Sequence, residues 1–284
     1  MMTILFLPMY NEQSSIPLLK EQLRASGFAG IDRIIAVDDG SKDRTFELLQ
    51  VWQREEPHLY VVSYHPNRGL PGAVTAGFAA AIYGTGFAQQ PGESAITAWS
   101  VAADGTTPDI LITMDADASH PVDLIPAMVR KINEGCDIVI ASRHQPGASQ
   151  RGLTLPRKVF SWGASTLMRI FYPIDGLLDY STNYRAYRAS LIREALQKSG
   201  GRLVESTGFV GVVELLLRLC SLDPKIGEVP LNLRYDLKES ESKMRVWKTV
   251  RGYLSLISKK KIRSRAGTCL PLLGRGSPGS VVPS

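Results

Sequence analysis

The stretch DILITMDADASHP, residues 109–121, places two aspartates directly after a short apolar run. One alanine separates Asp115 from Asp117, and a strand alternates its side chains, so both carboxylates can point to the same side. Two carboxylates at one point repel each other unless a cation lies between them. Mg²⁺ and Mn²⁺ bind oxygen ligands, and their shells are often completed by substrate phosphates. The stretch therefore predicts a buried strand that ends in a metal site for a diphosphate.

Short apolar runs alternate with helical patterns through the first half of the chain. The predicted strands are 3–7, 33–37, 60–63, 109–114 and 137–141, and the predicted helices between them are 16–25, 45–54, 71–83 and 121–133. Such alternation is typical of a mostly parallel sheet with helices on both faces. The second half is more helical, with helices predicted at 158–171, 190–197 and 210–219 and a strand at 226–233. The pattern predicts an α/β fold of the nucleotide-binding type.

Polar residues follow four of the predicted strands. Ligands of open parallel sheets bind outside the carboxyl ends of the strands, and the groups at those ends are Asn11-Glu12, Asp38-Asp39, Asp115-Ala116-Asp117 and Ser142-Arg143. Each group alone can equally cap the helix that follows it, but four on one rim favour a binding site. Neither GxxxxGK[ST] nor GxGxxG follows the first strand, so a nucleotide would be held in another way.

Positive charge is concentrated at the end of the chain. The net charge is +6, yet ten Lys or Arg and no Asp or Glu occur from Lys243 onward, which leaves 23 basic and 27 acidic residues in the first 242. This distribution excludes a uniformly basic nucleic-acid binder. We expect a catalytic domain over 1–242 with an inserted loop at about 84–108, a basic amphipathic helix over 243–265, and a disordered Gly/Pro/Ser-rich tail over 266–284.

The predicted basic helix suggests where in the cell the protein is located. Trp247, Val250, Leu254 and Ile257 recur at helical spacing among lysines and arginines, which suits an anionic membrane surface; the alternative is a helix packed on the body with solvated charges. No run of 18 apolar residues occurs, so we expect no transmembrane helix and attachment that is peripheral or through a membrane partner subunit. Three dispersed cysteines and no secretory signal favour the cytoplasmic face.

Several motifs together resemble the family-2 glycosyltransferases, which have the GT-A fold, and are most similar to polyprenyl (dolichyl) phosphate mannosyltransferases. The motifs are LPMYNE (7–12), AVDDGSKDRT (36–45), NRGLPGA (67–73), TMDADASHP (113–121), IASR (140–143), DYSTNYRAYR (179–188), GFVGVVELL (208–216) and EVPLNLRY (228–235). Their order and spacing extend the resemblance over roughly 3–244. In this chain Asn183 and Tyr184 stand where the resembling subgroup has Gly-Phe.

The resemblance implies a role for each matched residue. The nucleoside would be held by Pro8, Tyr10, Glu12, Asp38 and Asp39, and Mg²⁺ or Mn²⁺ by Asp115 and Asp117 with Ser119 close by. Arg143 would contact phosphate, and Arg157 and Ser161 would bind the phosphate of the acceptor. Arg234 and Lys243 would close over the site. Of these, Asp117, Arg143 and Arg157 are the expected catalytic residues. Glu214, inside an apolar helical run, is either functional or a buried structural partner.

The implied reaction is inverting transfer of a sugar, mannose from GDP-mannose, to a polyprenyl or dolichyl monophosphate. One alternative is a family-2 enzyme that uses a UDP-sugar, such as UDP-glucose, and a different lipid or a saccharide acceptor, which for a hydroxyl acceptor would require a general-base carboxylate. A second is a non-enzymatic nucleotide-sugar-binding subunit, and the intact Asp115/Asp117 pair argues against it. A nucleic-acid role has no recognition motif to support it.

Overall fold

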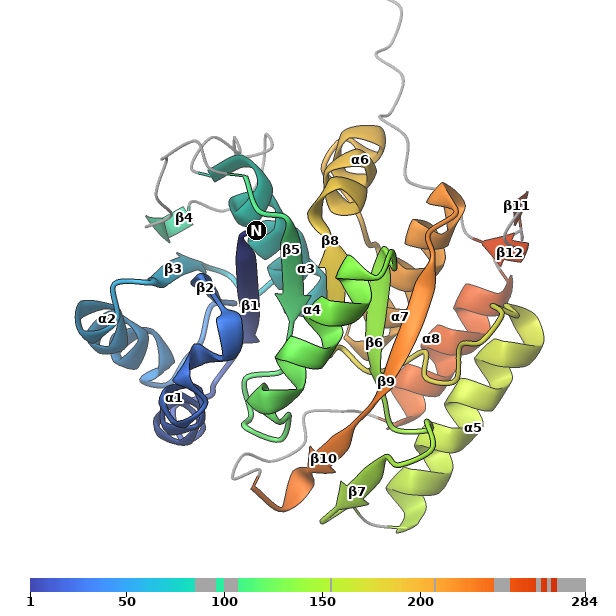
Figure 1. Ribbon diagram of the computed structural model, residues 1–284, viewed down its shortest axis with the longest axis horizontal. Coiled ribbons are helices and arrows are strands. Elements are labelled where there is room, and N and C mark those ends of the chain that lie inside the picture. Colours follow the sequence, from blue (N-terminus) through green and yellow to red (C-terminus); the bar gives the residue numbers. More distant parts are fainter. Residues whose placement is uncertain are drawn as a thin grey trace, which may run out of the picture.

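A central, mostly parallel sheet organises the chain, as the sequence predicts (Figure 1). The computed structural model describes residues 1–84, 96–99, 107–153, 155–206, 208–237, 246–258, 262–264 and 267–269. The sheet has eight strands in the order β4-β3-β2-β1-β5-β8-β6-β9. Six of them are β1 (Thr3–Met9), β2 (Arg33–Asp38), β3 (Leu59–Tyr64), β5 (Ile110–Thr113), β6 (Ile138–Ser142) and β9 (Ile226–Pro230). The pairs β1–β2, β1–β5, β2–β3 and β6–β9 are parallel.

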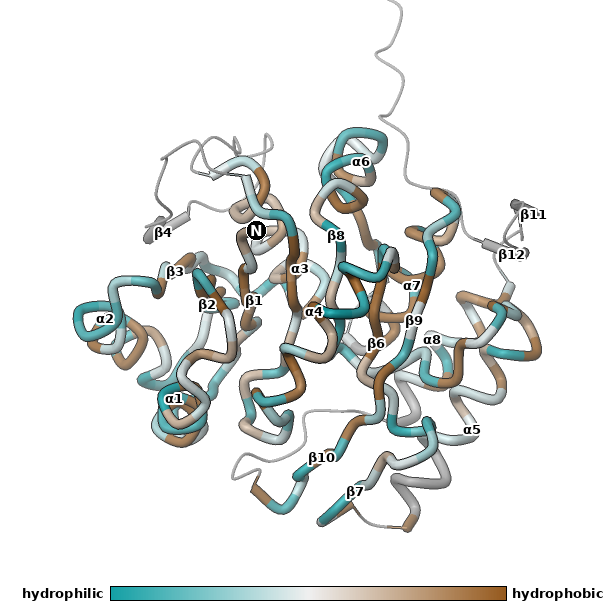
Figure 2. The backbone as a smooth tube through the Cα atoms, in the orientation of Figure 1, coloured by the Kyte–Doolittle hydropathy of each residue, from teal (hydrophilic) through white to brown (hydrophobic). Residues whose placement is uncertain are grey.

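Helices cover both faces of the sheet, because successive strand side chains point to opposite sides. In β1, Leu5, Leu7 and Met9 join one core with α1 (Ile16–Ala25), α2 (Thr45–Glu55) and α4 (Ile125–Asn133). On the other face, Ile4 and Phe6 join a core that includes α3 (Gly69–Tyr83), α5 (Leu155–Phe171), α6 (Ala189–Ser199) and α7 (Phe209–Leu219). Figure 2 shows β1, β5 and β6 as hydrophobic segments between these layers.

The sheet contains a strand that the sequence pattern did not predict. β8 (Arg185–Arg188) lies between β5 and β6 and is antiparallel to both. Arg185 pairs with Thr113 at the carboxyl end of β5. Because β8 runs in the opposite direction, the residues before it, 179–184, arrive at the rim where the parallel strands end. This strand therefore delivers the loop 179–184 to the expected binding edge.

The remaining segments refine the predicted boundaries. The predicted strand 226–233 is interrupted at Leu231, and β10 (Asn232–Arg234) pairs instead with β7 (Ser149–Arg151). Within the expected inserted loop, β4 (Ile96–Trp99) is antiparallel to β3. Helix α8 spans Val246–Ser258, shorter than the predicted 243–265, and β11 (Ile262–Ser264) pairs with β12 (Gly267–Cys269), which begins the predicted tail. In the described part of the chain, no helix has the length and apolar character needed to cross a membrane.

Candidate functional site

A cavity of about 800 Å³ opens where the parallel strands end. It brings together most of the residues that the sequence singled out: Pro8, Tyr10, Glu12, Asp39, Asp115, Asp117, Ser119, Arg143 and Ser161 all line it. Residues from the loop 179–184, from α5 and from α8 complete the wall. The predicted rim of the sheet is therefore a single chamber, closed on one side by two helices from the second half of the chain.

Four predicted residues are not among those that line the cavity. Asp38 is buried and accepts hydrogen bonds from the Ser63 hydroxyl at 2.8 Å and the Ser41 N–H at 3.1 Å. It thus links the ends of β2 and β3 and the loop after β2. Arg234 donates to the Asp236 carboxylate at 2.9 Å, and its side chain is 41% exposed. Arg157 belongs to α5, but its side chain lies outside the described part of the structure, and so does the whole of Lys243. The roles of these four residues stay predictions.

The segment from Asp115 to His120 is held from several sides. The Asp115 N–H donates to Nδ1 of His120 at 3.2 Å, and that imidazole stacks on Tyr184 with ring centroids 5.0 Å apart. The Ser119 hydroxyl and N–H donate to Oδ1 of Asp117 at 2.6 and 3.1 Å. Ala118 has a positive φ of 59°, a strained value for a residue other than glycine. These contacts fix the two carboxylates before any ligand arrives.

Asn183 links this segment to the loop 179–184. Its side chain is 3% exposed, lines the cavity, and donates from Nδ2 to Oδ1 of Asp115 at 3.0 Å. The neighbouring Tyr184 donates its hydroxyl to the Pro121 carbonyl at 2.8 Å. Both side chains stand where the resembling subgroup has Gly-Phe, and Asn183 reaches one of the expected metal ligands.

The two carboxylates have the chemistry that a hard divalent cation needs. Asn183 occupies one oxygen of Asp115, and in the described part of the chain no protein group bonds to the other. Among the described residues no cluster of three or more His, Cys, Asp or Glu side chains could hold a metal alone. A two-carboxylate site that relies on substrate phosphates for its remaining ligands is typical of Mg²⁺. The donor set therefore fits a metal that binds together with a diphosphate.

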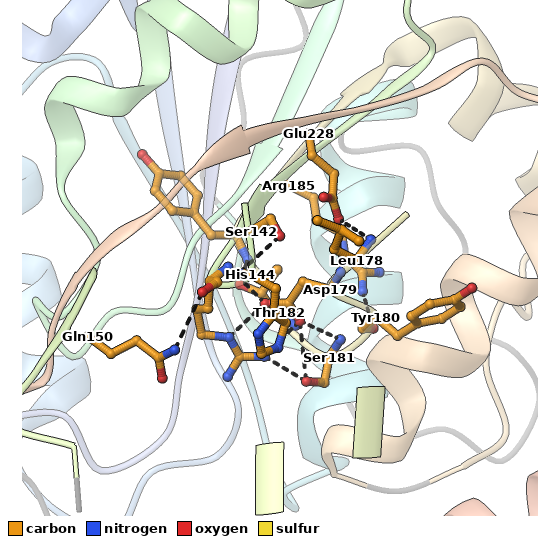
Figure 3. A network of polar contacts seen from close by, with 12 residues as sticks. Ser142, His144, Gln150, Leu178, Asp179, Tyr180, Ser181, Thr182, Arg185 and Glu228 are labelled. Carbon is orange, nitrogen blue, oxygen red and sulfur yellow. Dashed lines mark hydrogen bonds and ion pairs between the residues drawn. The ribbon is translucent and has the colours of Figure 1, made fainter. Parts of the chain in front are cut away.

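Arg143 is the best-anchored cation of the cavity. Its Nε and Nη2 both donate to the Asp179 carboxylate at 2.7 Å, and Nη2 also donates to the Ser181 hydroxyl at 2.7 Å. Asp179 is fully buried and further accepts the N–H groups of Ser181 and Thr182, as the network in Figure 3 shows. Burial alone would raise the pKa of Asp179, but Arg143 outweighs it and holds that pKa below its ordinary value. The pair is a bidentate, charge-assisted contact.

A second network supports the loop that carries Asp179. Glu228 accepts the N–H groups of Leu178 and Asp179 through Oε1 at 2.9 and 2.8 Å (Figure 3). The Gln145 amide donates to Oε2 of Glu228 at 2.8 Å. The structure thus fixes Arg143 through Asp179 and Asp179 through Glu228. Sequence reasoning had not assigned a role to Asp179 or Glu228, although both lie inside the quoted motifs.

Glu214 is a buried structural partner, one of the two roles left open for it. It accepts the Ser206 N–H at 2.7 Å and the Arg218 Nε–H at 2.8 Å. Burial alone would raise its pKa, but hydrogen bonds from Ser206 and Arg218 lower it below the ordinary value. Because Glu205 and Ser206 line the cavity, this buried carboxylate shapes one of its walls. Arg185 is likewise structural, since it donates to the carbonyls of Val212 and Tyr180.

Comparison with solved structures supports the fold. The chain is similar to glucosyl-3-phosphoglycerate synthase from Mycobacterium tuberculosis, crystallised with Mn²⁺, UDP-glucose and phosphoglyceric acid, with a TM-score of 0.58 and 19% identity over 90% of this chain and 77% of that one. Another structure of the same protein contains Mg²⁺ and UDP, with a TM-score of 0.56. At this identity the likeness shows the GT-A-like α/β fold alone, as predicted from the sequence.

Comparison with characterised sequences identifies the family. The undecaprenyl-phosphate mannosyltransferase of Micrococcus luteus is 30% identical over 244 residues, 86% of this chain and 88% of that protein. The polyprenol monophosphomannose synthase of Mycolicibacterium smegmatis is 28% identical over 230 residues, 81% of this chain and 76% of that protein. The model of "Glycosyl transferase family 2" matches residues 4–83 and 89–196. Its motifs, its fold and this match together place the chain in glycosyl transferase family 2.

Proposed function

We propose that this glycosyltransferase transfers mannose from GDP-mannose to a polyprenyl monophosphate, with inversion at the sugar. One observation carries the proposal: a single cavity combines the paired carboxylates Asp115 and Asp117 with Arg143 and Ser161, and two helices with exposed apolar side chains flank it. The names of two similar relatives, an undecaprenyl-phosphate mannosyltransferase and a polyprenol monophosphomannose synthase, support the lipid acceptor and the sugar.

The donor would bind across the carboxyl ends of the strands. Pro8, Tyr10, Glu12 and Asp39 lie on the β1–β2 side, where the nucleoside would sit. Asp39 is held by the Arg68 N–H at 2.7 Å and the Asn67 amide at 2.8 Å, while burial raises its pKa above the ordinary value. Asp115 and Asp117, with Ser119 beside them, would hold Mg²⁺ or Mn²⁺. When bound, the ion would offset charge that develops on the leaving diphosphate.

The acceptor needs orientation more than activation. A phosphate monoester is already anionic at neutral pH, so its oxygen can attack the sugar without a strong general base. Arg143 provides a guanidinium whose direction is fixed by two hydrogen bonds to Asp179. A preorganised donor of this kind positions an anion at little reorganisation cost. Arg157 and Ser161, both of α5, would help to hold the same phosphate.

The lipid tail and the membrane would lie along α5 and α8. The side chains of Leu155, Trp162 and Ile170 on α5 are 75%, 62% and 68% exposed, and Leu254 on α8 is 56% exposed. The same two helices place Ser161 and Tyr253 in the cavity wall. Large exposed apolar side chains near a phosphate site suit a peripheral contact with a membrane surface. We attribute membrane attachment to these helices because of their exposed apolar side chains; the expected partner subunit has no support in the relatives' names.

The test is transfer of radiolabelled sugar to a polyprenyl monophosphate in detergent, with GDP-mannose or UDP-glucose as donor and with or without Mg²⁺ or Mn²⁺. We expect a lipid-soluble product from GDP-mannose that disappears when EDTA is added. Transfer from UDP-glucose alone would preserve the family and refute the mannosyl donor. Transfer to a saccharide but to no lipid phosphate would refute the acceptor.

A further inference from the structure

Helix α8 forms a fixed part of the cavity wall. Tyr172, directly after α5, donates its hydroxyl to the Leu256 carbonyl of α8 at 2.7 Å. Gly252 faces α7 so closely that a Cβ at this position would lie 2.5 Å from Cγ2 of Val210. These two contacts set both the distance and the rotation of α8. The face it turns inward consists of Thr249, Gly252, Tyr253 and Leu256, and the first three of these line the cavity.

Tyr253 is distinctive on this face because its hydroxyl is unused. The residue is 3% exposed and lines the cavity, yet within the described part of the chain its hydroxyl makes no hydrogen bond. Buried tyrosine hydroxyls usually find a partner, and those of Tyr172, Tyr180 and Tyr184 donate to main-chain carbonyls at 2.7, 2.8 and 2.8 Å. The hydroxyl of Tyr187 also lacks a partner among the residues that the structure describes, but Tyr187 does not line the cavity. A ligand in the cavity would supply the acceptor that Tyr253 lacks.

The groups around Tyr253 favour an anionic ligand. Arg143 interacts electrostatically with Tyr253, and both line the cavity. In the described part of the structure, Nη1 of Arg143 has no protein acceptor, since Nε and Nη2 make all its contacts. The Ser161 hydroxyl, which also lines the cavity, is buried and has no hydrogen-bond partner among the described residues. Three unused donors thus line one chamber. Burial raises the pKa of Tyr253 to about 12, so its hydroxyl keeps the proton at neutral pH.

We propose that Tyr253 is a phosphate-binding residue whose hydroxyl donates to an oxygen of the phosphate held by Arg143 and Ser161. The inference rests on the proposed function, which requires phosphate in this cavity, and adds a residue from α8 to its recognition. Two phosphates of the reaction share this chemistry: the diphosphate of the donor and the monophosphate of the lipid acceptor.

The experiment compares Tyr253→Phe with Tyr172→Phe. Both variants remove one tyrosine hydroxyl on or beside α8. That of Tyr172 bonds to the protein, and within the described part of the chain that of Tyr253 does not. Isothermal titration would measure Kd for farnesyl phosphate and, separately, for inorganic pyrophosphate in the presence of Mn²⁺. A hydrogen bond to a charged group contributes enough that its loss weakens binding roughly ten- to a hundredfold. We expect Tyr253→Phe to show this loss with an unchanged Tm. Tyr172→Phe should show a lower Tm and a smaller change in Kd, because the Gly252–Val210 contact still holds α8 in place.

The two probes identify which phosphate Tyr253 contacts. A loss confined to farnesyl phosphate would assign the hydroxyl to the acceptor, and a loss confined to pyrophosphate would assign it to the donor. Wild-type affinity of Tyr253→Phe for both probes would overturn the inference and leave the proposed function standing. If the wild-type protein bound neither probe, the proposed function would fail and the inference with it.

Discussion

Asp179→Asn is the substitution that most directly tests how the cavity is built. Asp179 is fully buried and receives two hydrogen bonds of 2.7 Å from Arg143, besides those from the Ser181 and Thr182 N–H groups. The amide keeps the shape but removes the charge, and it turns one acceptor into a donor that faces a guanidinium. Removing one partner of a buried ion pair costs about 3–5 kcal/mol. For a domain of this size that corresponds to a Tm lower by roughly 6–20 °C.

The matched control is Asp236→Asn. Asp236 also accepts hydrogen bonds from two guanidinium nitrogens, Nε of Arg234 at 3.0 and 3.2 Å and Nη2 at 2.9 Å. Here, however, both side chains of the pair are about 40% exposed. Exposed ion pairs contribute little because water screens them, so we expect no measurable change in Tm. Differential scanning calorimetry of the two variants compares the loss in Tm for a buried and for a partly exposed Arg–Asp pair. Equal Tm values for Asp179→Asn and Asp236→Asn would refute the claim that burial makes the Arg143 pair important.

The same pair predicts a pH dependence. Because Arg143 lowers the pKa of Asp179 in the folded protein, the charged carboxylate contributes stability that is fully present above the unfolded value of about 3.9. That stability is lost as the pH falls below this value toward the folded pKa. We therefore expect the free energy of unfolding, measured with urea, to fall more steeply from about pH 5 to pH 2 in the wild type than in Asp179→Asn. Parallel curves for the two proteins would contradict the assignment.

Three further predictions concern the metal, the core and the membrane. Asn183→Ala should weaken Mn²⁺ binding in the presence of GDP by roughly 10- to 100-fold, because Asp115 loses the amide that orients it; unchanged affinity by electron paramagnetic resonance would contradict this. Gly77→Ala should lower the free energy of unfolding in urea by about 1–3 kcal/mol, because the new Cβ would overlap the Phe6 ring. The control is Gly163→Ala, whose Cβ would meet no atom of the described residues within 4 Å and which should raise that free energy by about 0.5–1 kcal/mol. Leu155→Ser with Trp162→Ser should reduce co-sedimentation with anionic vesicles without lowering Tm, since both side chains are exposed; full retention would argue against contact through α5.

The parallel part of the fold could be predicted because its strands are continuous apolar runs. β8 could not, because Arg185-Ala186-Tyr187-Arg188 has a charged residue at each end. Arg185 is nevertheless fully buried, and it is accommodated by donating to the carbonyls of Val212 and Tyr180. The Tyr180 carbonyl is near in sequence, but the Val212 carbonyl belongs to α7, so no local pattern predicts that Arg185 can be buried. The short strand β7 is mostly polar, so no apolar run predicts it. The predicted strand 226–233 extends into β10, but the pattern does not show that β10 leaves the sheet to pair with β7.

A residue's place in the site can be predicted when the residue directly follows a strand. It is harder to predict when the residue lies on a helix or in a longer loop. Asp39, Asp115, Asp117 and Arg143 lie at strand ends, so their convergence follows from a parallel sheet. Tyr253 could not be found this way. The predicted apolar stripe of α8 includes Leu254, which is exposed, whereas the inward face depends on how closely Gly252 approaches Val210. Periodicity identifies an amphipathic helix, but the rotation of that helix is decided by tertiary contacts.

The loop 179–184 joins the two halves of the site. Asp179 at its start fixes Arg143, and Asn183 near its end holds Asp115. Antiparallel β8 anchors the loop to the end of β5, where the Thr113 hydroxyl donates to the Asn183 carbonyl at 2.5 Å. The cation that would orient a phosphate and the carboxylate that would hold a metal are thus positioned by one short segment. A change at either end of this loop should therefore alter both anion and metal affinity, whereas a change in a strand-end residue alone should alter one.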